Sequence, residues 1–137
     1  MNPSPLQFDT SDPLAGISPF ARVEATEAAL DLLGDVRARH GAVSFHHPDS
    51  FADGTALTCL AKDELELGDH DHLLGEVEGA PVYVSTDYAL TWRRRQLIID
   101  AIRGHAGGFS LEGGLGRRFF TRTRLYKPEH LEVLGLI

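Results

Sequence analysis

Cysteine is nearly absent from this 137-residue chain, in which Cys59 is the sole thiol. One cysteine cannot form an intramolecular disulfide, and no signal peptide precedes the first polar residues, so we expect a cytoplasmic protein. Long apolar runs are missing as well, because stretches such as 97–99 are far shorter than the roughly 18 residues that span a bilayer. The sequence therefore predicts neither a disulfide framework nor a membrane protein.

Positive charge is also scarce, since 13 Lys and Arg face 20 Asp and Glu, which gives a formal net charge of -7. This balance repels polyphosphate at long range and argues against nonspecific nucleic-acid binding. The two signs are unevenly distributed. Carboxylates predominate from 62 to 87, whereas cations predominate from 93 to 127.

The size and composition of the chain predict one domain. Its hydrophobic fraction of 42% and charged fraction of 24% are ordinary for a globular protein. A chain of this length can bury a core without help from a metal or a disulfide. Residues 1–22 are rich in proline and turn-forming residues, so we expect a loose N-terminal tail followed by a single domain over 23–137.

One main helix and several short strands are predicted. Apolar residues recur at helical spacing up to His40, with Thr26 placed to cap the first turn and Gly41 to end the helix. Alternation or β-branched composition predicts strands at 43–46, 56–61, 73–77, 81–84 and 97–102. Glu78 and Gly79 lie where a hairpin turn is expected.

The C-terminal part carries two further predictions. A glycine-rich turn at 113–116 indicates a second hairpin, formed by 109–112 and 117–126. Short helices are expected from 85 or 86 to 92 and after Pro128. Together these elements predict an α+β fold, a small mixed or mostly antiparallel sheet covered by the N-terminal helix.

Four ordered motifs resemble one small bacterial family of unknown function, whose members are commonly encoded beside acetaldehyde dehydrogenase. They are Asp71-His72-Leu73-Leu74-Gly75-Glu76, Leu97-Ile98-Ile99-Asp100, Gly107-Gly108-Phe109-Ser110-Leu111-Glu112-Gly113 and Arg118-Phe119-Phe120-Thr121-Arg122. The likeness covers about 23–126 and implies an aldehyde dehydrogenase as partner. A fainter likeness, from 82 to the Phe109 segment, is to the HesB-like A-type iron–sulfur carriers and concerns the fold.

The same family carries a strand ending in Phe-His, tandem cysteines, Asp-Gly and a third cysteine. Phe45-His46, Asp53-Gly54 and Cys59 match this pattern, but Phe51 and Ala52 stand where the tandem cysteines would be. Phenyl and methyl groups neither bind soft metals nor act as redox nucleophiles. Thiol or metal chemistry of the cysteine-bearing relatives is therefore in doubt here, and one cysteine cannot hold an iron–sulfur cluster within a single chain.

The remaining metal candidates are His46, Asp53 and Cys59. A loop between two strands can bring them together around a divalent metal, although no recognised ligand spacing is present. The alternative is a polar turn in which Cys59 is a small buried hydrophobe, and it predicts no cofactor. The neighbouring segment 69–72 is interpreted as a solvated acidic loop.

A second candidate site is cationic. Arg118, Arg122 and Arg124 share one face of a predicted strand. They can contact an acidic surface, including that of a second copy in a homo-oligomer, or bind a small carboxylate or phosphate through guanidinium forks. Internal neutralisation by the acidic hairpin, with protection of an edge strand, is the third interpretation.

The function that the resemblance implies is that of a non-catalytic accessory or binding protein of an aldehyde-oxidation system. The alternative is a metal-binding or thiol-dependent enzyme or sensor centred on the loop 46–59. No nucleophile with an identifiable base is present in the sequence, so no catalytic residue is predicted.

Overall fold

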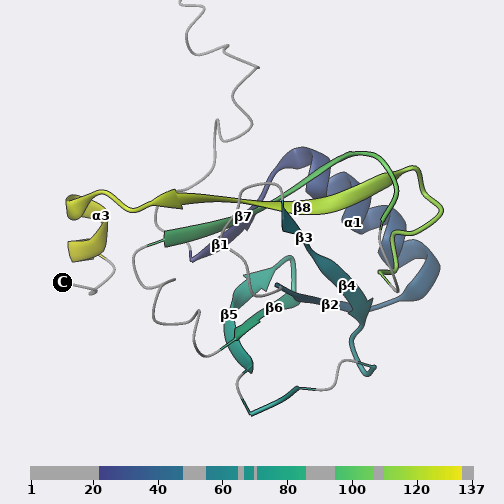
Figure 1. The fold of residues 1–137 in the computed structure, drawn as a ribbon, viewed down its shortest axis with the longest axis horizontal. Coiled ribbons are helices and arrows are strands. Elements are labelled where there is room, and N and C mark those ends of the chain that lie inside the picture. Colours follow the sequence, from purple (N-terminus) through teal and green to yellow (C-terminus); the bar gives the residue numbers. More distant parts are fainter. Residues whose placement is uncertain are drawn as a thin grey trace, which may run out of the picture.

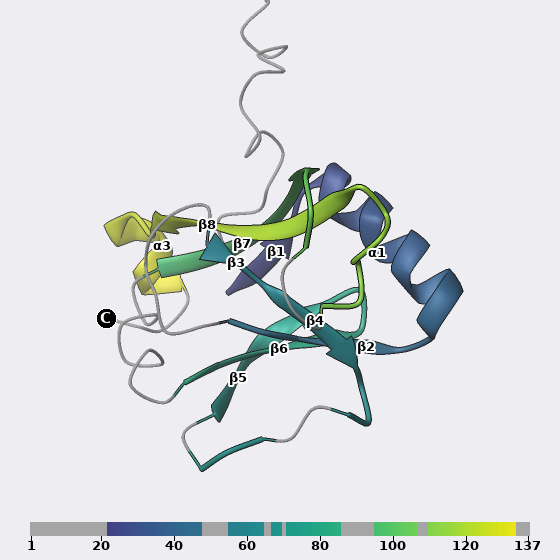
Figure 2. The same cartoon turned by 45° about the vertical axis from the view of Figure 1, so that its right-hand side comes forward.

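The computed structural model describes residues 22–47, 55–64, 67–69, 71–85, 95–106 and 110–133. Two four-stranded sheets face each other, and a long helix lies at one side of them (Figures 1 and 2). In chain order the elements are β1 (Val23–Ala25), α1 (Glu27–His40), β2 (Val43–His46), β3 (Thr55–Ala56), β4 (Thr58–Ala61), β5 (Asp71–Val77), β6 (Ala80–Ser85), β7 (Arg95–Arg103), β8 (Arg117–Leu125) and α3 (Pro128–Val133).

Both sheets are mixed. Sheet A has the order β1-β7-β8-β3, in which β1 is parallel to β7 and the other pairs are antiparallel. Sheet B has the order β4-β2-β6-β5, in which only β2 and β6 are parallel. Figure 1 shows sheet A in the upper half of the molecule and sheet B in the lower half. The α+β fold class expected from the sequence is confirmed, with two sheets where one was expected.

The helix α1 begins and ends where its sequence signals predict. The Thr26 side chain accepts a hydrogen bond from the Ala29 amide at 3.2 Å, which satisfies one of the amides that the first turn leaves without a partner. At the other end Gly41 has φ 80, a conformation that glycine adopts without strain. Arg37, Arg39 and His40 in the last turn complement the negative end of the helix dipole.

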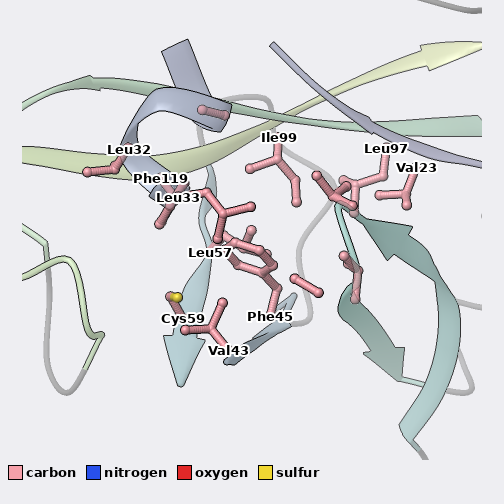
Figure 3. Close-up of a cluster of buried hydrophobic side chains, with 14 of the residues drawn as sticks. Val23, Leu32, Leu33, Val43, Phe45, Leu57, Cys59, Leu97, Ile99 and Phe119 are labelled. Atoms are coloured by element: carbon pink, nitrogen blue, oxygen red, sulfur yellow. The ribbon is translucent and has the colours of Figure 1, made fainter. Parts of the chain in front are cut away.

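The hydrophobic core lies between the sheets and is completed by α1 (Figure 3). Alternation along β7 directs Leu97 and Ile99 inward, and Phe119 of β8 lies on the same face. Phe45 of sheet B meets Phe119 edge to face, with ring centroids 5.0 Å apart. This aromatic contact joins the inner faces of the two sheets.

Two backbone features bring the sheets close together. The chain passes from β3 in sheet A to β4 in sheet B through the buried Leu57, so one continuous segment belongs to both sheets. The second feature lies between β5 of sheet B and β1 of sheet A, where a β-carbon added at Gly75 would lie 2.9 Å from Val23 Cγ1. The absence of a side chain at Gly75 therefore permits the close approach of β5 to β1.

Several predicted elements are confirmed. They are α1, the strand at 43–46, the β5–β6 hairpin with its turn at Glu78 and Gly79, the central strand β7 and the C-terminal helix α3. The short helix expected up to residue 92 and most of the expected tail lie outside the described residues. No helix within the described ranges is long and apolar enough to cross a membrane.

Three expectations about strands are wrong. The second hairpin does not form as predicted, because 111–116 is a series of turns and β8 pairs with β7 instead. The single strand expected at 56–61 is divided between the two sheets at Leu57. β8, expected as an edge strand, lies between β7 and β3, and β3 pairs with it at Phe120 and Thr121.

Candidate functional site

Cys59 lies on the inner side of sheet B and is fully buried. Its register partner is the core residue Phe45, and Figure 3 shows it beside Val43 and Phe45. Burial, followed by the negative charge of Glu112, raises the pKa of the Cys59 thiol to about 12. The thiolate is the nucleophilic and metal-binding form, so Cys59 acts as a small core residue at neutral pH.

A buried polar network holds the loop that follows β7 against Cys59. The Ser110 hydroxyl accepts a hydrogen bond from the Cys59 amide at 2.8 Å and donates one to the Glu112 carboxylate. The other Glu112 oxygen accepts a bond from the Phe119 amide at 3.0 Å. Both oxygens of a buried carboxylate are thereby satisfied, which assigns the Ser110 and Glu112 of the third sequence motif a structural role.

His46 points to the opposite side of sheet B from Cys59. Neighbouring residues of a strand face opposite ways, and the register places His46 opposite Thr58 while Phe45 faces Cys59. The structure therefore does not bring His46 and Cys59 to one centre, and Asp53 lies outside the described residues. Among the described residues, no group of three His, Cys, Asp or Glu side chains is placed to hold a metal ion.

The partner of His46 is Asp71, at the start of β5. His46 Nε2 lies 2.8 Å from Asp71 Oδ1, and the other carboxylate oxygen accepts a bond from the Gly68 amide at 2.7 Å. The Asp71 side chain is only 14% exposed, while that of His46 is 33% exposed. A histidine oriented by a carboxylate is typical of metal and proton-transfer sites.

Sequence reasoning assigned Asp71 to a solvated loop and missed this contact. The register shows why the two residues meet, because Tyr83 is the neighbour of His46 on β6 and Leu73 faces Tyr83 from β5. Asp71 is two residues before Leu73 and therefore lies on the same face of β5. The sequence identified His46, at the end of a phenylalanine-histidine strand, as a metal candidate, but no sequence signal links it to Asp71.

The outer face of sheet A carries the arginines predicted as a cationic site. Register pairs Arg118 with Ile102, Arg122 with Ile98 and Arg124 with Gln96, so all three lie on the side away from the core. Arg122 Nε donates to Asp100 at 2.9 Å, and Arg124 Nε donates to the buried Gln96. The sequence interpretation assigned the neutralisation of these arginines to the acidic hairpin, whereas the carboxylate that pairs with Arg122 among the described residues is Asp100 of β7.

Acidic residues are concentrated in β5, an outer strand of sheet B, and in the chain segments on either side of it. Leu67 and Leu73 are 51% and 50% exposed there, two of the four large apolar residues that are exposed within the described part of the chain. The carboxylates of this strand and of the segments next to it in the chain are Asp63, Glu64, Asp69, Asp71, Glu76 and Glu78, all of them on exposed residues except Asp71. We call this set, with Leu67 and Leu73, the acidic edge.

The chain belongs to the family described as domain of unknown function DUF779, whose model matches residues 32–125. The unknown-function family expected from the sequence motifs is thereby confirmed. No curated protein matches the chain.

Solved structures that are similar to this one include those of IscA and SufA. The crystal structure of IscA with the 2Fe-2S cluster is 17% identical, covers 75% of this chain and 84% of its own, and has a TM-score of 0.41. Escherichia coli SufA, involved in the biosynthesis of iron–sulfur clusters, is 18% identical, covers 77% and 93%, and has a TM-score of 0.42. At such scores neither a cluster nor a role in cluster biosynthesis is transferred to this chain.

Proposed function

We propose that this chain is a non-catalytic accessory protein that binds a protein partner within an aldehyde-oxidation system. The observation that carries the binding role is the acidic edge, in which two half-exposed leucines, Leu67 and Leu73, belong to a stretch of chain rich in carboxylates. Exposed apolar side chains rimmed by charge are typical of protein-binding surfaces. The link to aldehyde oxidation rests on the resemblance of the sequence motifs to the family encoded beside acetaldehyde dehydrogenase.

The position of the acidic edge supports partner binding. β5 is an outer strand of sheet B, and outer strands can accept a further strand unless they are covered or charged. The carboxylates here would repel a second copy of the same edge, because like charges oppose pairing. A partner with a basic, partly apolar surface is complementary to the acidic edge.

The buried Cys59 supports a role without thiol catalysis. A thiol whose pKa is about 12 supplies almost no nucleophile near neutral pH. Its sulfur also lies within the core, away from both His46 and the acidic edge. We therefore do not propose a function that depends on a reactive cysteine.

Calorimetric titration of the chain with an acetaldehyde dehydrogenase, the enzyme beside which members of the resembled family are commonly encoded, tests the proposal. We expect saturable binding that Leu73→Ser weakens by about tenfold, because one interfacial leucine contributes roughly 1.5–3 kcal/mol when fully buried. Leu125→Ser is the matched control, since Leu125 is 63% exposed on β8 and outside the acidic edge. An absence of binding by the unmodified chain would contradict the proposal.

A second function, binding of a divalent metal through His46, is favoured by the Asp71 contact. A carboxylate that holds one imidazole nitrogen leaves the other oriented to coordinate a metal. Asp53 remains a proposed co-ligand from the sequence. Zinc titration should then give a site that His46→Ala abolishes and Cys59→Ser leaves intact. A site lost only in Cys59→Ser would reverse this assignment.

A further inference from the structure

Two guanidinium groups share one aromatic ring on the outer face of sheet A. The guanidinium carbon of Arg122 lies 4.9 Å from the centroid of the Phe120 ring, and that of Arg118 lies 5.9 Å from it. The three residues alternate along β8 and therefore project from the same face. Stacking on an aromatic ring restricts a guanidinium group without consuming its hydrogen-bond donors.

A buried carboxylate binds the Nε group of Arg122. Its Nε donates to Asp100, whose side chain is only 8% exposed. The same carboxylate accepts bonds from the Thr26 hydroxyl at 2.7 Å and the Ala101 amide at 2.8 Å. The bonds from Thr26 and Ala101 therefore orient the Asp100 carboxylate without help from Arg122. The oriented carboxylate then restricts the position of the Arg122 guanidinium through Nε.

The Arg122 side chain is 35% exposed, so its guanidinium can be reached from solvent. Within the described residues, the one acceptor that contacts this guanidinium is Asp100, through Nε. Arg118 forms no ion pair with any residue that the structure describes. Among the described residues of sheet A, Arg118, Arg122 and Arg124 share this face with two carboxylates, Asp100 and Glu24, and these five side chains carry a net positive charge. An anion that approaches it meets donors that are already ordered.

We propose that Arg118 and Arg122 form a binding site for a small carboxylate. The two terminal N–H groups of a guanidinium match the two oxygens of a carboxylate, and a second cation stabilises the same charge. Because the groups are ordered by Phe120 and Asp100, binding loses little side-chain entropy. The choice of a free acid rests on the proposed function, since oxidation of an aldehyde yields a carboxylate. The guanidinium arrangement stands independently of it.

Titration with sodium acetate, followed by the NMR signals of the arginine Nε–H groups, tests the site. Ionic strength is held constant with sodium chloride, because screening by salt alone also shifts arginine signals. We expect saturable shifts for Arg118 and Arg122. Arg122→Lys keeps the charge but loses the fork and should weaken binding about tenfold or more. Arg39→Gln, at an exposed position in the last turn of α1, should leave the affinity unchanged.

Arg118→Gln serves as the second variant, because it removes a cation that is not part of a described ion pair and leaves the Asp100 contact in place. It should weaken acetate binding by about threefold to tenfold without changing the circular dichroism spectrum. Shifts that do not saturate, or that equal those caused by chloride, would overturn the proposal. Tighter binding of inorganic phosphate than of acetate would overturn the carboxylate assignment, and concentration-dependent dimers lost in Arg118→Gln would assign the face to a second copy instead.

The two proposals fail separately. Acetate titration uses the chain alone, whereas partner binding depends on Leu73 at the other sheet. If the unmodified chain binds the partner but shows no saturable acetate binding, only the carboxylate site is refuted. Absence of partner binding with a saturable acetate site refutes only the accessory role.

Discussion

The Thr26→Ala substitution should destabilise the protein more than the loss of one surface hydroxyl would, because this hydroxyl serves two partners. It accepts the Ala29 amide at 3.2 Å as the cap of α1 and donates to Asp100 at 2.7 Å. Loss of an N-cap costs about 1 kcal/mol. A lost bond to a buried charged group costs about 1.5–3 kcal/mol more. We therefore expect the free energy of unfolding to fall by about 2.5–4 kcal/mol.

Thr26→Ser is the matched control for this substitution. Serine keeps the hydroxyl and removes one methyl group, so it should cost only about 1 kcal/mol. Urea unfolding followed by circular dichroism measures both values. In a double-mutant cycle with Asp100→Ala, the two sites should couple by about 1 kcal/mol or more. Equal stabilities of the Ala and Ser variants, or zero coupling, would refute the assignment of both roles to one hydroxyl.

Two further predictions concern Cys59 and the glycines. Since the pKa of Cys59 rises from 9.0 to about 12 on folding, the unfolded chain loses its thiol proton first, and stability should decline above about pH 9. The decline attributable to Cys59 is about 1.4 kcal/mol at pH 10, measured as the difference in denaturant unfolding between the unmodified chain and Cys59→Ala, and an identical pH dependence of the two would exclude it. Gly75→Ala should cost about 1–3 kcal/mol, because its new methyl group would lie 2.9 Å from Val23 Cγ1. Gly34→Ala, within α1 with nothing inside 4 Å, should instead add about 0.5–1 kcal/mol, and thermal unfolding of the two variants that gave the same sign would contradict the packing argument.

The elements that could be predicted from the sequence are those specified by neighbouring residues. The helix α1 has its cap, its apolar spacing and its terminating glycine within one segment. The β5–β6 hairpin has a two-residue turn at Glu78 and Gly79, both at positive φ, which local composition indicates. The two faces of β8 also follow from alternation alone, and the register confirms them.

The errors arise where a strand pairs with a distant one. β1 was not predicted as a strand, because three residues carry little pattern and its partner β7 lies far along the chain. The glycine-rich segment before β8 resembles a hairpin turn, yet its Ser110 and Glu112 bond to Cys59 and Phe119 instead. Such contacts depend on tertiary packing, which overrides local turn chemistry.

The candidate sites divide in the same way. Arg118 and Arg122 could be assigned to one surface from the period of a strand, and the structure adds the Asp100 and Phe120 contacts beneath them. The pairing of His46 with Asp71 requires a third strand, β6, to lie between their own strands. No spacing rule within a single segment describes that arrangement.

The position of β1 has a consequence for how the protein is made. The strand β1 pairs in parallel with residues Leu97, Ile98 and Ile99 of β7. It therefore cannot pair until β7 has been synthesised, about 70 residues later in the chain. Pairings between such distant segments form slowly, because the chain entropy lost on closing a long loop is spent before any hydrogen bond compensates for that loss. We expect the newly translated β5–β6 hairpin to form before sheet A exists. A polypeptide released before β7 would leave β1 and the apolar face of α1 exposed to chaperones and proteases.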